Sequence, residues 1–140
     1  MYKRILIPTD GSIGADRGVE TGLDLAGQYD ATIHALFVVD ERIYGETPGL
    51  SDMELRFEQI EDRGEEFLSE IETQADELGL DVRTTVRRGM PYEIITAYAD
   101  EHDVDLIVMG RHGASAHPVP HIGSCTDRVL RTASVPVLPA

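Results

Sequence analysis

Short runs of consecutive apolar residues alternate along this chain with longer segments in which apolar residues recur every three or four positions. The first pattern is typical of strands buried on both faces, and the second is typical of amphipathic helices. The sequence predicts strands at residues 3–8, 32–39, 82–86, 105–110 and 135–138. It predicts helices at about 13–28, at 51–78, from Pro91 through Ala99, and at 124–132. Because strands and helices alternate, we expect one parallel sheet with right-handed crossovers and helices on both faces.

Local signals qualify some of these elements. Residues 82–86 alternate apolar and polar positions, which indicates a shorter strand nearer the edge of the sheet. Ser12 is placed to cap the first helix, whereas the glycines within that helix weaken it. Gly79 is expected to end the long charged helix. The apolar stripe of the long helix consists of Met53, Phe57, Ile60, Phe67, Leu68, Ile71, Ala75 and Leu78.

The length of the chain suits one domain, residues 1–140, and is too small for two. The 26 acidic residues exceed the 12 basic ones and give a net charge of −14. This excess argues against binding to nucleic acids or anionic membranes, because both need basic surfaces. Two interpretations of the charge stay open. The chain is an ordinary acidic protein, or it is adapted to a cytoplasm of high ionic strength, where salt screens repulsion between surface carboxylates.

The sequence predicts neither export nor a membrane span. It has no run of 18 apolar residues, and the apolar stretch before Pro8 is too short for a signal peptide. Cys125 is the single cysteine, so no internal disulfide is expected. We therefore expect a cytoplasmic location.

Glycines at a fixed spacing follow the strand at 105–110 and precede the last helix. The pattern is Gly110-x2-Gly113-x9-Gly123-Ser124. Ligands of open parallel sheets bind beyond the carboxyl ends of the strands, where the strand order reverses. Backbone N–H groups beside glycine can approach an anion closely, and the start of the following helix favours phosphate. The structural alternative is that Gly110 and Gly113 only make a tight turn and Gly123 caps the helix.

This pattern resembles the nucleotide motif of the universal stress protein family, and the resemblance extends along nearly the whole chain. Residues 5–12 (ILIPTDGS) resemble the family's first strand and acidic loop, and residues 37–40 (FVVD) resemble its second strand. Residues 88–91 (RGMP) resemble its entry to the third helix. Residues 126–131 (TDRVLR) and 135–138 (VPVL) resemble its closing segment. The resemblance implies a single-domain open α/β fold, Rossmann-like and adenine nucleotide alpha hydrolase-like, with five parallel strands in the order 3-2-1-4-5.

The resemblance also implies roles by position. The adenosine side would be lined by Pro8, Thr9 and Asp10, with the backbone of Val38 against adenine. The ribose and phosphates would lie against Met109, Gly110, His112 and Gly113, and the phosphate tail against Gly123, Ser124, Cys125 and Thr126. Arg111, from its place in the same loop, is a further candidate to contact the nucleotide, and the alternative is that it faces solvent. Val38 and Met109 would add apolar walls for a purine. The implied ligand is ATP or another adenine nucleotide, and the implied assembly is a homodimer. A bound triphosphate would suit Mg²⁺ bridging its phosphates, with Asp10 as a candidate to contact the ion through water. For Asp10 the structural alternative is an Asx turn that caps the first helix.

Two features depart from the family pattern. Residues 114–122 contain Pro118 and Pro120, which remove two amide donors and stiffen the loop, where the family commonly has a basic, leucine-rich segment. At the end of the chain, Pro139 lacks an N–H and Ala140 is the last residue. A dimer made through the last strand would therefore be shortened or altered.

Other chemistry is weakly indicated. His117, His121 and Cys125 are spaced to hold a metal on a helix, but the prolines among them oppose that helix. The P-loop and nucleophile-elbow motifs are absent, and no pair of base and nucleophile stands out. The favoured function is an adenine-nucleotide-binding stress-response or regulatory protein that is non-catalytic or at most a slow ATPase. The alternative is a protein-interaction module of the same fold that has lost nucleotide binding.

Overall fold

The structure is a computed structural model that describes residues 1–11, 13–41, 50–111 and 123–140. Its strands are β1 (Arg4–Thr9), β2 (Thr32–Asp40), β3 (Val82–Gly89), β4 (Leu106–Met109) and β5 (Val137–Pro139). Its helices are α1 (Ile13–Tyr29), α2 (Leu50–Glu77), α3 (Pro91–Glu101) and α4 (Ser124–Thr132). Within these ranges the strands form one parallel sheet in the order β3-β2-β1-β4-β5, which confirms the predicted fold class and strand order.

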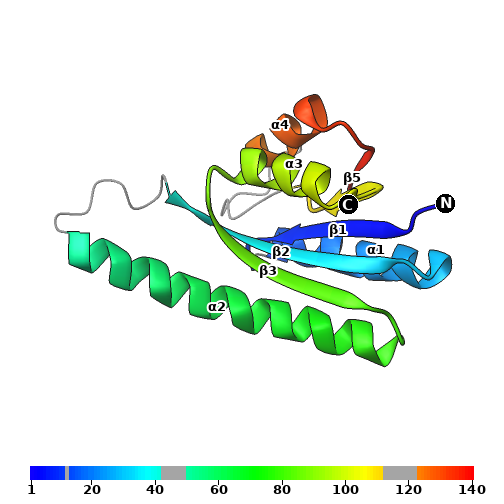
Figure 1. Cartoon of the computed structure of the whole chain (residues 1–140), viewed down its shortest axis with the longest axis horizontal. Helices are drawn as coiled ribbons and strands as arrows, with labels where there is room; N and C mark the ends of the chain where they lie inside the picture. Colours follow the sequence, from blue (N-terminus) through cyan, green and yellow to red (C-terminus); the bar gives the residue numbers. More distant parts are fainter. Residues whose placement is uncertain (12, 42–49, 112–122) are drawn as a thin grey trace.

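The helices cover the sheet from both sides (Figure 1). α1 and α2 pack on one face, and α3 and α4 pack on the other. Successive residues of β1 go to opposite faces, so that Ile5 and Ile7 join the core under α1 and α2, and Leu6 joins the core under α3 and α4. Because both faces are buried, the strand is an unbroken apolar run in the sequence. Among the described residues, no helix is both long and apolar enough to cross a membrane.

β3 lies at the edge of the sheet, as predicted, but it is longer than predicted. It runs alongside β2 as far as Gly89, which lies opposite Asp40. The prediction of a short strand was wrong because it relied on the apolar pattern, which ends where the arginines begin. An edge strand tolerates such residues, since its side chains keep access to water and to acidic neighbours. Arg88 donates to both carboxylate oxygens of Glu54, at 2.9 and 3.1 Å, and also to Glu61.

The predicted end of the long helix is confirmed, but one residue of its stripe is misplaced. α2 stops at Glu77, and Gly79 turns the chain with a φ of +70°. Leu78 was expected in the core and is 55% exposed, because the turn directs it outward and brings Leu80 into the core instead. The side chain of Met53 lies outside the described part of the structure. The buried members of the predicted stripe are Phe57, Leu68, Ile71 and Ala75.

Candidate functional site

β1 and β4 are neighbours in the middle of the sheet, but they separate toward their carboxyl ends. Their pairing ends at Leu6 opposite Ile107. β1 stays paired with β2 on its other side as far as Thr9 opposite Phe37. The chain runs from β1 outward to β2 and β3 and then returns to β4 on the opposite side, so the strand order reverses between β1 and β4. In open parallel sheets such a reversal marks the crevice in which ligands bind.

Next to this crevice, the end of β4 and the first turns of α1 are in contact through their backbones. A Cβ atom on Gly110 would lie 2.1 Å from the carbonyl oxygen of Gly14. A Cβ atom on Gly18 would lie 2.7 Å from the backbone nitrogen of Gly110. Glycine is required because any side chain would force these backbones apart. Gly110 therefore has a packing role that the sequence analysis did not foresee, and the glycines of α1 serve a contact instead of only weakening a helix.

The start of α4 is held beside the end of β4 by a buried hydrogen bond. The Thr126 hydroxyl donates to the Gly110 carbonyl at 2.8 Å, and Thr126 is 3% exposed. α4 begins at Ser124, and the Asp127 N–H donates to the carbonyl of Gly123, the residue that caps the helix. The positive end of the α4 dipole therefore lies next to the carboxyl end of β4, where it favours an anion.

Several backbone donors of residues predicted to contact the nucleotide are used within the chain. The Gly123 N–H donates to the Arg111 carbonyl, so this amide is engaged within the chain. The Arg111 N–H donates to the Ala140 carbonyl at 3.1 Å, and the Ala140 N–H donates to the Met109 carbonyl at 2.8 Å. These bonds join the end of the chain to the end of β4, because backbone groups that leave a sheet edge need partners of their own. A ligand contact by the other atoms of these residues stays a prediction.

The loop after β1 is shaped by Thr9. Its hydroxyl accepts the Gly11 N–H at 3.1 Å, and Thr9 is 7% exposed. Pro8 is buried, whereas Asp10 is exposed. Gly11 lies against α2, where a Cβ atom would be 2.2 Å from the Phe67 ring. The loop is therefore fixed by packing, and it presents Asp10 at the surface beyond the carboxyl end of β1.

The two apolar walls expected for a purine differ in accessibility. Val38 keeps part of its surface exposed near the end of β2. Met109 is 6% exposed and belongs to the core under α3 and α4. In the first turn of α4, Ser124 is exposed and Cys125 is half-buried against the same core. Ser124 is therefore the most accessible of these four side chains and Met109 the least accessible.

Other predicted positions lie outside the described residues. These are Ser12, His112, Gly113, His117, Pro118, Pro120 and His121. Their roles stay predictions. Within the described ranges, no group of three or more histidine, cysteine, aspartate or glutamate side chains is arranged to hold a metal ion.

A buried polar cluster that the sequence analysis missed lies under α3, toward the amino end of β2. His34 Nδ1 is 2.7 Å from the Tyr98 hydroxyl, and His34 is 3% exposed. The Tyr98 ring stacks on the His102 ring at a centroid distance of 3.9 Å. Burial above all, and then positive charge from His102 and two arginines, lowers the pKa of His34 from 6.5 to about 4. His34 is thus a neutral hydrogen-bonding residue at pH 7, and its place within an apolar run gave no distinct signal.

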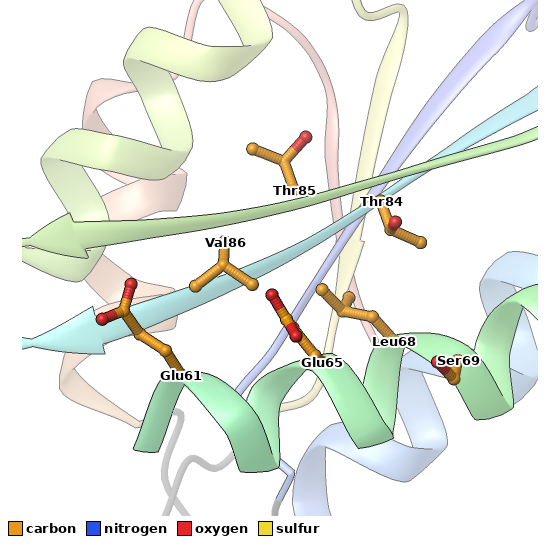
Figure 2. A pocket seen from close by; sticks show the side chains of 7 residues that line it. All are labelled: Glu61, Glu65, Leu68, Ser69, Thr84, Thr85 and Val86. Carbon is orange, nitrogen blue, oxygen red and sulfur yellow. The ribbon is translucent and has the colours of Figure 1, made fainter. Parts of the chain in front are cut away.

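A separate groove of about 470 Å³ lies between α2 and the outer strand β3 (Figure 2). It is lined by Glu61, Glu65, Leu68, Ser69, Thr84, Thr85 and Val86. None of these residues was assigned to the nucleotide, and no element at the β1–β4 crevice contributes to the lining. The groove is therefore a second feature of the surface.

Comparison with known proteins finds relatives over the full length of the chain. The sequence model of the universal stress protein family matches residues 1–139. A universal stress protein of Methanocaldococcus jannaschii is 33% identical over 138 residues, which cover 99% of this chain and 81% of the relative. Among solved structures, that of MJ0577 from the same organism is 26% identical, with a TM-score of 0.89 over 100% of this chain and 96% of the other.

Two further solved structures share the fold and contain ligands. A universal stress protein in complex with cAMP has a TM-score of 0.74 at 23% identity and covers 99% of this chain and 97% of its own. A family protein of Arabidopsis thaliana with AMP bound has a TM-score of 0.70 at 15% identity and covers 98% of this chain and 90% of its own. At these identities the likeness concerns the fold alone.

Proposed function

Because this chain belongs to the universal stress protein family, we propose that it binds an adenine nucleotide in the crevice between the carboxyl ends of β1 and β4. The proposal is supported by two proteins of the same fold that hold cAMP and AMP. The proposed role is regulatory. Occupancy by the nucleotide changes the surface that the protein offers to a partner, and the nucleotide is turned over slowly or not at all.

The observation that carries this proposal is the separation of β1 from β4 beyond Leu6 and Ile107. In open parallel sheets, ligands bind beyond the carboxyl ends of the strands at such a point, and a purine favours apolar neighbours. The bond from Thr126 to Gly110 holds the positive end of α4 beside the carboxyl end of β4. The apolar strand ends therefore suit adenosine, and the start of α4 suits phosphate.

Accessible side chains suit particular parts of the ligand. Asp10 is exposed beyond β1, and its carboxylate suits the ribose hydroxyls as a hydrogen-bond acceptor. Ser124 is exposed in the first turn of α4, and its hydroxyl suits a phosphate oxygen. Mg²⁺ prefers carboxylate, water and phosphate oxygens, so an ion that arrives with the phosphates suits Asp10 through its waters. Val38 adds apolar surface for adenine.

One observation favours the second candidate, an interaction module that has lost nucleotide binding. The Gly123 N–H, the Arg111 N–H and the Thr126 hydroxyl belong to residues predicted to contact the nucleotide, and all three groups are bonded within the chain. Phosphate binding then depends on the remaining donors of the α4 start and on residues of the 112–122 segment. If these donors are too few to bind phosphate, the protein keeps its fold but binds no nucleotide.

Mass spectrometry of nucleotide that co-purifies with the protein tests the choice between these candidates. We expect an adenine nucleotide at near-stoichiometric occupancy, and we expect added ATP or AMP to raise the melting temperature of the stripped protein. A ligand at a hundredfold its dissociation constant adds ~2.7 kcal/mol to the free energy of unfolding. The absence of both effects, in dilute buffer and in molar KCl, would establish the interaction module instead.

Ser124→Glu separates phosphate binding from folding. A carboxylate in the first helical turn is favourable for α4 but repels a phosphate at the same place. We expect the stability of the free protein to stay the same or rise slightly. We expect the nucleotide no longer to raise the melting temperature, with Ser124→Ala as the uncharged control. If the nucleotide still raised the melting temperature of Ser124→Glu, the phosphates would have to bind elsewhere.

Three further expectations stay predictions: a homodimer, a cytoplasmic location and adaptation to high salt. The homodimer is checked by sedimentation at several concentrations. Adaptation to high salt is checked by unfolding in dilute buffer and in molar KCl, where screening of the −14 charge should raise the stability.

A further inference from the structure

β3 is the outermost strand, and one of its edges has no partner in the described residues, where it pairs with β2 alone. The Ile33 N–H donates to the Asp81 carbonyl, and Ile33 lies opposite Val82. Backbone groups of successive strand residues point in opposite directions, so the odd-numbered residues of β3 bond to β2. The N–H and C=O groups of Thr84 and Val86 therefore point outward, away from the sheet.

The groove between α2 and β3 lies along this free edge. Thr84 and Val86 form its upper wall, and Leu68, which is 3% exposed, lies at its base (Figure 2). Glu65 rises from α2 toward β3. It makes no ion pair or hydrogen bond with another described residue, whereas the neighbouring Glu61 accepts from Arg88. The α2 side of the edge therefore offers an exposed carboxylate with no ion-pair partner among the described residues.

The opposite side of the edge carries positive charge. Arg83 lies opposite His34 in the ladder and on the α3 side of the sheet, where it is exposed and has no ion-pair partner among the described residues. Arg87, further along on the same side, lies 5.0 Å from the centre of the Tyr98 ring and pairs with Glu101 at 3.0 Å. A strand added to this edge would thus meet carboxylate on one face and guanidinium on the other.

We propose that the free edge of β3 binds an extended segment of a partner protein in which acidic and basic residues alternate. The segment adds a strand by bonding its backbone to Thr84 and Val86. Because side chains of a strand alternate between faces, its basic residues point toward Glu65 and its acidic residues toward Arg83. This surface is distinct from the proposed nucleotide crevice and does not depend on it.

A second copy of this chain suits the same edge poorly when the two β3 strands pair about Thr85. Antiparallel pairing of two β3 strands about Thr85 would place Arg83 opposite Arg87, and like charges directly opposite each other are destabilising. It would also bring together two α2 helices that each carry eleven acidic residues, from Asp52 to Glu77, against two arginines. Arg83 thus discourages self-pairing in this register and also attracts the acidic residues of an alternating partner.

Amide hydrogen exchange with a synthetic peptide tests this inference. The probe is a short acetylated peptide of alternating glutamate and lysine, titrated at low salt. We expect exchange at Thr84 and Val86 to slow severalfold while exchange at Thr85, whose N–H faces β2, stays unchanged. The controls are a peptide of equal composition with its glutamates grouped together, and the alternating peptide with every second backbone nitrogen methylated. Both controls should leave the exchange at Thr84 and Val86 unchanged.

Variants of the two faces sharpen the test. We expect Glu65→Lys and Arg83→Glu each to weaken peptide binding roughly fivefold or more, as loss of a surface ion pair plus repulsion implies. Glu66→Lys changes an exposed neighbour on α2 outside the groove lining and should leave the affinity unchanged.

Three results would overturn the proposal: no protection by the alternating peptide, equal protection at Thr85, or equal effects of Glu65→Lys and Glu66→Lys. Slowing of exchange at Thr84 and Val86 with protein concentration alone would assign the edge to a second copy and also overturn it. The measurement is made without nucleotide, so its failure leaves the proposed nucleotide site unaffected.

Discussion

The two faces of the sheet are held by different means. On the α1 and α2 side, helix backbone meets strand backbone, and a Cβ atom on Gly18 would collide with the Met109–Gly110 peptide. On the α3 and α4 side, side-chain hydrogen bonds are buried, from Thr126 to Gly110 and between His34 and Tyr98. The first face therefore depends on shape, and the second depends also on polar groups that respond to pH and to hydrogen-bond partners.

This difference separates what fixes the fold from what is available for binding. The glycine contacts bring α1 against the end of β4 and do not depend on a titrating group. The α4 start, by contrast, is held beside β4 by hydrogen bonds from the Thr126 hydroxyl to Gly110 and from the Gly123 N–H to Arg111. We therefore expect changes on the α1 side to affect folding first, and changes on the α4 side to affect ligand affinity as well as stability.

The largest effect is expected from Gly18→Ala. The new methyl would lie 2.7 Å from the Gly110 nitrogen, and backbone cannot rotate away as a side chain can. Overpacking of this kind should cost about 3 kcal/mol or more in the free energy of unfolding, measured by urea denaturation. If Gly18→Ala lowered the free energy of unfolding by less than an ordinary surface substitution does, α1 would not pack against β4 at Gly18.

Acid should selectively weaken the α3 side through His34. Its pKa is lowered to about 4 in the folded protein, so the unfolded chain binds the proton more readily. The contribution of His34 is complete above pH 6.5 and falls as the pH drops toward 4, by up to about 3 kcal/mol. His34→Gln keeps a partner for Tyr98 but cannot titrate. Unfolding free energies of both proteins over this range should therefore converge as the pH falls, and parallel curves would contradict the assignment.

Loss of the Thr126 hydroxyl should have a moderate effect. Thr126→Val keeps the shape but leaves the buried Gly110 carbonyl without its partner, at a cost of about 1–2 kcal/mol. The matched control is Thr132→Val, which removes an exposed hydroxyl that donates to the Arg128 carbonyl, and it should cost less. Nucleotide affinity should fall in Thr126→Val alone. Equal effects of the two variants would show that the α4 start is not held by this bond.

The smallest effect should be a gain in the stability of the protein. A methyl group added at Gly27 of α1 would have no other group within 4 Å, in contrast to one added at Gly18 of the same helix. Gly27→Ala should therefore stabilise the protein by about 0.5–1 kcal/mol, because it removes freedom from the unfolded chain and favours the helix. Thermal unfolding measures the gain, and a loss would mean that Gly27 has a contact of its own.

The arrangement of the sheet could be predicted because its signals are local or shared by the family. Buried strands such as β1 and β4 are unbroken apolar runs, and Gly79 marks the end of α2 as expected. The family resemblance supplied the strand order, which an apolar pattern alone does not contain. Leu78 was misplaced because the helical period was continued one residue beyond Glu77, where α2 ends.

The geometry of the candidate site was less predictable because its contacts join distant parts of the chain. Local propensity counts Gly18 as a defect in a helix, and only the fold shows that it lies against Gly110. The glycine pattern likewise pointed to the Gly123 amide and the resemblance to Thr126, but the Gly123 N–H and the Thr126 hydroxyl both have partners within the chain. A motif specifies which donors are present, and it does not specify which of them remain available.

A titration of the isotope-labelled protein with AMP and ATP, followed by amide NMR, tests the central claim most directly. We predict saturable shifts at Thr9, Val38 and the first turn of α4, with Thr84 and Val86 on the β3 edge unmoved. Shifts centred on the β3 edge, or none at millimolar nucleotide in low and high salt, would contradict a nucleotide site between β1 and β4.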